Sequence, residues 1–125
     1  MNVVTNLALF FGVVLSVGAT LIAHEATHLC AARLISEPTV SIRSWAPLRL
    51  NVDFCEDSVS PSKIRLVAVA PTLIGLLFAA TFTILDGFSW LNNQDPYYLS
   101  RITVMYWILY SHISPADLRT FITPH

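Results

Sequence analysis

The chain has 125 residues, of which 54% are hydrophobic and only 12% are charged. A soluble domain usually carries about 25% charged residues, so this composition is typical of a membrane protein, in which lipid covers the apolar surface. The net charge of −1 and the lack of a basic run argue against a nucleic-acid partner. The length predicts one domain over residues 1–125.

The first predicted element is a membrane-spanning helix over residues 7–35. At 1.5 Å per residue it is about 43 Å long, which exceeds the roughly 30 Å hydrocarbon core of a bilayer. Glu37-Pro38 ends it, because proline pushes the residue before it out of the helical region. Residues 1–23 contain no Lys or Arg, so the basic region of a cleaved signal peptide is missing.

A short β-ribbon is predicted next, over residues 39–56. The segment TVSIRSWAPLRLNVDF alternates apolar and polar residues, and a period of two indicates strands. Ala46-Pro47 separates the two alternating runs and is expected to form the turn. We therefore predict a two-stranded ribbon between the first and second helices.

The second predicted helix spans residues 61–85. Ser60 suits the N-cap and Pro61 the first helical position. The stretch 66–85 carries no charge, as expected of a segment that crosses a membrane. Pro71 is expected to kink this helix.

Asp86-Gly87 is expected to end the second helix, with a polar turn over residues 87–95. The third predicted helix covers residues 96–113, with Asp95-Pro96 as its N-cap and first position. Its 18 residues, about 27 Å, are barely long enough to cross the membrane. A short helix over residues 115–122 is predicted to follow.

These elements define an all-α membrane protein with three transmembrane helices and a small cytoplasmic β-ribbon. Six of the seven basic residues flank the predicted inner ends of the helices, and only Arg101 lies on the other side. Positive charge concentrates on the cytoplasmic side of membrane proteins. We therefore expect a multi-pass protein of the cell membrane whose N-terminus is outside and whose β-ribbon and C-terminus are cytoplasmic.

One pentapeptide of the first predicted helix contains candidate metal-binding residues. HEATH, residues 24–28, matches the pattern H-E-x-x-H. On a helix, residues i and i+4 share a face, so His24 and His28 can direct two imidazoles at one Zn²⁺. Glu25 lies about 100° further round, where it can take a proton from a water whose pKa the zinc lowers towards about 7. Ionisable residues inside a membrane segment are costly, which favours a functional role.

A catalytic zinc site usually has a third protein ligand and one open position. The side chains that could supply this ligand are Asp86, His112, Asp117, Cys30 and Cys55. Asp117 is preferred because the predicted topology returns it to the depth of the two histidines, whereas Asp86 falls on the opposite side of the membrane. His112 remains an alternative, either as a ligand or as a residue that supports a ligand. Ser114-Pro115-Ala116-Asp117 also fits a capping box, a role expected to compete with metal binding for the Asp117 carboxylate.

With HEATH on the first helix and APTLIG at residues 70–75 on the second, the chain resembles the site-2 protease family of intramembrane zinc metalloproteases. The family carries its aspartate ligand on the third core helix in an N-x-x-P…L-D-G setting. Here the corresponding segment is HISPADL, residues 112–118, and a literal LDG occurs earlier, at residues 85–87.

The resemblance implies a zinc-dependent endopeptidase that hydrolyses a peptide bond of a membrane protein or peptide in or near the bilayer, from the cytoplasmic side. An exposed edge of the ribbon, SIRSW or LRLNV, is expected to hold the substrate in an extended form by strand addition. The alternative is a non-catalytic zinc- or partner-binding membrane protein descended from that family.

Overall fold

The computed structural model describes residues 2–45, 48–54, 59–94 and 99–124. Its elements, in chain order, are α1 (Val3–Ile35), β1 (Thr39–Trp45), β2 (Leu48–Asp53), α2 (Pro61–Ile84), α3 (Gly87–Gln94), α4 (Leu99–Ser111) and α5 (Pro115–Ile122). The protein is thus mostly helical with one small antiparallel sheet, as predicted.

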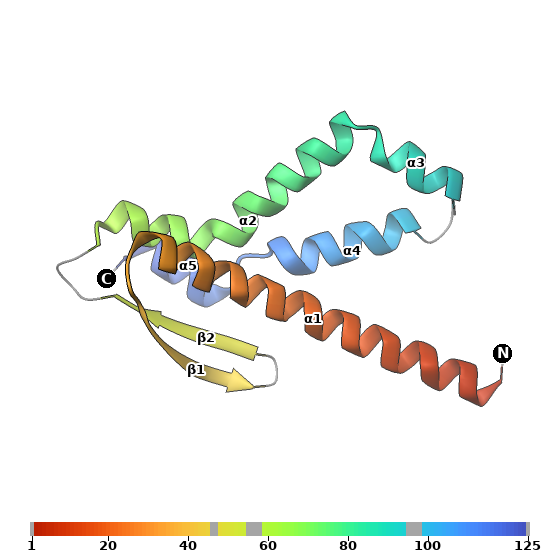
Figure 1. The fold of residues 1–125 in the computed structure, drawn as a ribbon, viewed down its shortest axis with the longest axis horizontal. Helices are drawn as coiled ribbons and strands as arrows, with labels where there is room; N and C mark the ends of the chain where they lie inside the picture. The colour runs from red at the N-terminus through yellow and green to blue at the C-terminus, as the bar shows by residue number, and fades with distance from the viewer. Residues whose placement is uncertain (1, 46–47, 55–58, 95–98, 125) are drawn as a thin grey trace.

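The elements form two arms that join at one end of the molecule (Figure 1). One arm is the N-terminal part of α1, and the other is built from α2, α3 and α4. The two strands lie beside the C-terminal part of α1, and α5 packs against α2. Segments from the beginning, middle and end of the chain therefore meet at the same place.

Helix α1 begins earlier than the sequence predicted, at Val3 instead of residue 7. Asn2 explains the difference, because its side-chain oxygen accepts a hydrogen bond from the Thr5 amide at 2.8 Å and so caps the helix. The helix ends at Ile35, as predicted.

Helix α2 begins at Pro61 as predicted, although the side chain of Ser60 makes no capping hydrogen bond. It ends one residue before the predicted end, and Asp86 reverses the chain with a left-handed φ of 57°. Asp is one of the few residues that adopt this conformation at low cost. The helix continues through Pro71, and Figure 1 shows it changing direction part-way along its length.

The polar turn predicted for residues 87–95 is wrong over most of its length, because Gly87–Gln94 form helix α3. The apolar residues in this segment explain the helix. Leu91 is buried, and the ring of Phe88 meets that of Phe82 edge-on at a centroid distance of 4.9 Å. Packing against α2 thus outweighs the polar composition of the segment.

Two helices of the described chain, α1 and α2, are long and apolar enough to cross a membrane. The predicted third membrane helix ends at Ser111, two residues before its predicted end. Its described part, α4, has 13 residues, which is about 20 Å at 1.5 Å per residue. The predicted N-cap Asp95 and Pro96 lie outside the described residues.

The predicted β-ribbon is present as an antiparallel pair of β1 and β2, with Ile42 opposite Leu50. The register shifts between Ile42 and Ser44, which marks a β-bulge. The predicted turn residues Ala46-Pro47 lie outside the described part of the chain.

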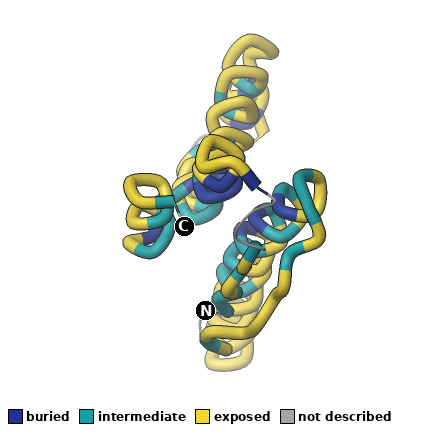
Figure 2. Tube along the Cα trace, turned by 90° about the vertical axis from the view of Figure 1, so that its left-hand side faces the viewer, coloured by how far each residue is buried: buried dark blue, intermediate teal, exposed yellow. Residues whose placement is uncertain are grey.

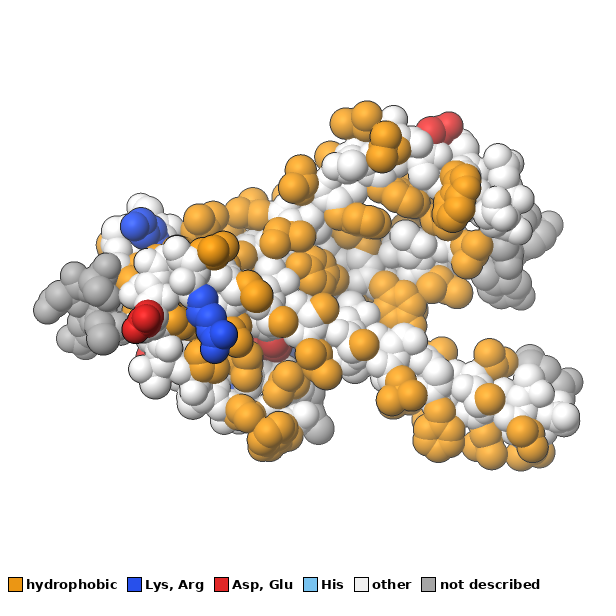
Figure 3. All heavy atoms as spheres, viewed as in Figure 1, with side chains coloured by type: hydrophobic (Ala, Val, Ile, Leu, Met, Phe, Trp, Pro, Cys, Tyr) orange, Lys and Arg blue, Asp and Glu red, His pale blue; other side chains and the backbone are white. Residues whose placement is uncertain are grey.

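Buried residues gather where the two arms join, while most of the remaining trace is exposed (Figure 2). On the face shown in Figure 3, apolar side chains cover both arms, and the Lys and Arg side chains lie at the end that carries the strands. Only 6% of the most apolar stretch of α1 and 28% of that of α2 are buried. These helices are therefore not the enclosed core of a globular domain.

Gly75 permits close approach of α2 and α4, and this contact can be tested. A Cβ atom at Gly75 would collide with the Ser111 side chain, next to the hydrogen bond that Trp107 Nε1 donates to the Gly75 carbonyl at 2.7 Å. We expect Gly75→Ala to lower the free energy of unfolding by about 1–3 kcal/mol, the usual cost of overpacking. Unfolding in detergent, followed by circular dichroism, measures this change.

Gly18→Ala is the matched control, because a Cβ atom there would meet nothing within 4 Å. It should leave the stability unchanged or raise it slightly, since alanine favours the helix. Equal loss of stability in both variants would contradict close packing at Gly75.

Candidate metal centre

Helix α1 places His24 and His28 one turn apart on the face that packs against the rest of the protein. Their exposed fractions are only 2% and 7%, on a helix whose side chains are otherwise mostly exposed and apolar. Burying polar rings is costly unless each nitrogen has a partner. The contacts of the four ring nitrogens therefore indicate what the site can hold.

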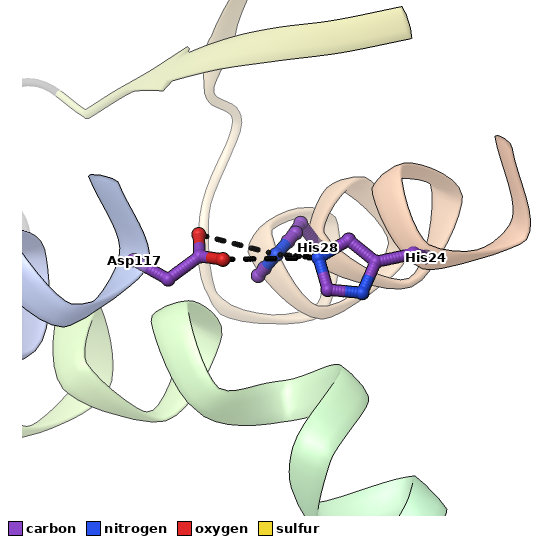
Figure 4. A group of neighbouring side chains, drawn as sticks. All are labelled: His24, His28 and Asp117. Carbon is purple, nitrogen blue, oxygen red and sulfur yellow. Dashed lines mark hydrogen bonds and ion pairs between the residues drawn. The ribbon is translucent and has the colours of Figure 1, made fainter. Parts of the chain in front are cut away.

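Asp117, from the first turn of α5, completes a cluster with the two imidazoles (Figure 4). Its Oδ1 lies 3.3 Å from His28 Nε2, and its Oδ2 lies 3.7 Å from His24 Nε2. The two Nε2 atoms are 3.2 Å apart. The sequence-based choice of these three residues thus identifies side chains that the fold brings together from opposite ends of the chain.

These separations fit a tetrahedral metal ion. With ligand bonds of about 2.0–2.1 Å, two ligand atoms of a tetrahedral zinc site lie about 3.3–3.4 Å apart. The separation of the two Nε2 atoms, 3.2 Å, and that of His28 Nε2 from Asp117 Oδ1, 3.3 Å, are close to this value. His24 Nε2 lies 3.7 Å from the other carboxylate oxygen, Oδ2. One possible ligand atom from each of the three residues lies within 4.8 Å of the others, so the three side chains are close enough to serve one ion.

The hydrogen bonds of the rings also suit a metal. His24 Nδ1 lies 2.6 Å from the Tyr110 carbonyl oxygen, and His28 Nδ1 lies 2.8 Å from that of Val67. A carbonyl oxygen only accepts, so each Nδ1 must carry the donated proton. In the neutral rings both Nε2 lone pairs then point into the cluster, where they repel each other unless a proton or a metal ion lies between them. Such an arrangement is usual for metal-binding histidines.

The capping box predicted at the start of α5 is present, and it holds the carboxylate in place. The Ser114 hydroxyl accepts from the Asp117 amide at 3.1 Å, while Asp117 Oδ2 accepts from the amide and the hydroxyl of Ser114. These bonds use Oδ2, which is also the oxygen nearest to His24, and leave Oδ1 directed at His28. The expected competition between capping and metal binding therefore stays a prediction.

The Asp117 carboxylate is also kept ionised. Its burial raises the pKa, but hydrogen bonds donated by His24 and His28, when their Nε2 atoms carry protons, and by the Ser114 hydroxyl have the larger effect, so the pKa lies well below the usual range. An ionised carboxylate is the form that binds zinc.

Among the residues that the structure describes, the other third-ligand candidates lie outside the cluster. His112 stacks on His24 with the ring centroids 4.4 Å apart, and its Nδ1 donates to the Leu109 carbonyl. It therefore supports the His24 ring by packing. Asp86 follows the far end of α2, Cys30 is exposed, and Cys55 lies outside the described residues.

Glu25 lines the same cavity as His28 and Asp117. The cavity has a volume of about 250 Å³ and includes residues 49–54 of β2 and the segment after it. Glu25 Oε2 accepts a hydrogen bond from the Leu50 amide at 3.0 Å, so the outer edge of β2 faces this carboxylate. Glu25 is thus held beside the cluster without being part of it.

The sequence reasoning missed the backbone carbonyls of Val67 and Tyr110, because a side-chain motif says nothing about backbone partners. No protein-family model, curated protein or solved structure matches the chain. The chemistry of the site is therefore inferred from its own geometry.

Metal analysis tests the assignment of the ligands. We expect the purified protein to bind one Zn²⁺ per chain, and His28→Ala or Asp117→Asn to weaken binding by more than the roughly 10–100-fold that loss of a supporting partner costs. Competition with a chromogenic chelator in detergent measures the affinity.

His112→Phe is the control for this experiment, since it keeps an aromatic ring stacked on His24 and removes only the nitrogens. Its affinity should stay close to that of the unsubstituted protein. Loss of zinc in His112→Phe equal to that in Asp117→Asn would show that the third ligand has been assigned wrongly.

Proposed function

We propose that the protein is a zinc-dependent intramembrane endopeptidase that hydrolyses a peptide bond in or near the membrane. The observation that carries the proposal is the convergence of His24, His28 and Asp117 on one point, with the carboxylate of Glu25 in the same cavity. Three ligands and an adjacent base are the elements that a zinc hydrolase requires.

Each residue has a defined role in this proposal. His24, His28 and Asp117 would hold the zinc ion. Bound zinc would lower the pKa of a coordinated water to about 7. Glu25 acts as the general base, and because Leu50 holds its Oε2, its other oxygen can accept the proton and later deliver it to the leaving amine.

The position of the site along α1 suits hydrolysis at the membrane surface. At 1.5 Å per residue, His24 lies about 32 Å from the beginning of the helix, close to the thickness of the hydrocarbon core. In this arrangement α1 and α2 cross the bilayer, and the end that carries the strands and α5 faces the cytoplasm, where most of the basic residues are expected. Water then reaches the metal from the cytoplasmic side.

The substrate in this proposal is a membrane protein or peptide that binds as an added strand. A helical segment must unwind before hydrolysis, because its carbonyls are hydrogen-bonded within the helix. The Leu50 amide points away from β1 and towards Glu25, and because strand geometry repeats every two residues, the Val52 amide points the same way. This edge of β2, LRLNV, is therefore favoured over SIRSW as the binding edge.

Replacing the proposed base separates catalysis from metal binding. We expect Glu25→Gln to keep zinc and to reduce cleavage by at least about 100-fold, because the amide cannot take a proton. Mass spectrometry of newly formed peptide ends, in membranes that contain either form, measures cleavage of any membrane protein that serves as substrate.

Glu37→Gln is the matched control, since Glu37 is exposed and lies beyond the end of α1. It should cleave as the unsubstituted protein does. Normal cleavage by Glu25→Gln, or no cleavage by the unsubstituted zinc-loaded protein, would refute the proposed activity and favour a non-catalytic zinc protein.

Substitution at the edge of β2 tests how the substrate binds. Val52→Pro removes the outward-facing amide, and since this amide does not bond to β1, the pairing of the two strands should survive. We expect the rate of cleavage to fall at least tenfold, because losing a backbone hydrogen bond to the substrate costs about 1.4 kcal/mol. The zinc affinity should not change. Val52→Thr keeps the amide and should cleave normally; an equal loss in both would point to the side chain instead.

A further inference from the structure

Pro71 lies in the middle of α2 with its side chain almost completely buried. Proline in a helix interior is costly, because it has no amide hydrogen and its ring clashes with the carbonyl four residues before it. In α2 that carbonyl belongs to Val67. The proline therefore leaves the Val67 oxygen without its helical partner.

The Val67 oxygen accepts a hydrogen bond from His28 Nδ1 at 2.8 Å. An ordinary residue at position 71 would place its own amide hydrogen on this oxygen. The hydrogen bond from His28 thus uses the Val67 carbonyl, which is free because residue 71 is a proline.

The second histidine is held in the same way by a different route. His24 Nδ1 bonds to the carbonyl of Tyr110, the residue before the last one of α4. The final four carbonyls of a helix have no partner within it. Each imidazole therefore donates to a backbone oxygen that has no amide partner within its own helix. The oxygen in α2 lacks a partner because of the proline, and the oxygen in α4 lacks one because it lies at the end of the helix.

We propose that Pro71 is a positioning residue for the metal centre. By removing one amide hydrogen from α2, it reserves the Val67 carbonyl for His28 Nδ1 and so directs the Nε2 lone pair at the metal. This inference rests on the proposed metal site but not on proteolysis, and it concerns a residue that touches neither metal nor substrate.

Pro71 also fills space and bends α2, so the experiment must separate these effects from the missing amide hydrogen. Pro71→Ala changes all three. The α-hydroxy acid analogue of alanine at position 71, introduced by nonsense suppression, has the same small side chain and the same freedom to straighten. It differs from Pro71→Ala in having an ester oxygen in place of the N–H, which also makes the carbonyl of residue 70 a weaker hydrogen-bond acceptor.

The zinc affinity of both variants is measured by chelator competition in detergent. We expect Pro71→Ala to bind zinc about 10–100-fold more weakly, the usual cost of losing a partner of a metal-binding histidine. The hydroxy acid variant should recover most of this loss, because the Val67 oxygen stays free. Pro61→Ala is a control at the exposed first position of α2, where proline costs no helical hydrogen bond, and it should bind zinc normally.

Equal affinity of Pro71→Ala and the unsubstituted protein would overturn the inference, as would an equal loss in the alanine and hydroxy acid variants. If the unsubstituted protein bound no zinc, the metal site itself would be refuted, which is a distinct outcome.

A second substitution covers the case in which the position 71 variants do not fold. Replacing Ala68 by its own α-hydroxy acid keeps the side chain and turns the Val67 amide carbonyl into an ester carbonyl, a weaker hydrogen-bond acceptor. The same replacement at Ala70 weakens the carbonyl of residue 69 instead. We expect zinc affinity to fall at least several-fold more at position 68 than at position 70, and an equal effect would overturn the inference.

Discussion

The structure depends on two imidazoles that point their lone pairs at each other within a buried cluster. This arrangement is stable only if each ring gives its proton to an acceptor elsewhere and something positive or proton-bearing occupies the space between the rings. Four helices meet these requirements, because α1 supplies the rings, α2 and α4 supply the carbonyl acceptors and α5 supplies the carboxylate. The contacts that hold the four helices together are therefore also the contacts that orient the rings and the carboxylate of the cluster.

The position at which α4 ends contributes to this arrangement of the rings and the carboxylate. Because α4 ends at Ser111, the Tyr110 carbonyl is left free for His24, and three residues later Ser114 begins α5. A longer helix would have used this carbonyl internally and carried Asp117 away from the rings. The capping box then orients the carboxylate, so one break between helices provides both an acceptor for His24 and a carboxylate that faces the two rings.

Local patterns in the sequence predicted those features that local interactions determine. The i, i+4 spacing of the histidines, the alternation of the strands and the S-P-A-D capping box each depend on neighbours only a few residues apart. The helix at residues 87–94 and the early end of α4 could not be read in this way, because they depend on contacts with α2. The backbone partners of the rings were hidden for another reason, since Val67 and Tyr110 act through atoms that every residue has. The sequence predicted only a kink at Pro71, although a proline without an amide hydrogen also predicts a free carbonyl four residues earlier, at Val67.

The division of the molecule into apolar arms and a charged end determines what chemistry the cluster could serve. The exposed apolar surface of α1 and α2 is best covered by lipid, whereas hydrolysis needs water and proton transfer needs groups that stay ionised. A cluster at the junction of the arms meets both conditions. Its two histidines come from the end of the apolar helix α1 and its carboxylate from α5, while Glu25 and the edge of β2 line the adjoining cavity. The bond from Leu50 to Glu25 links the two functions in the proposed mechanism, because the strand that would align a substrate also orients the base that would act on it. An added strand would therefore lie next to both the base and the metal ligands.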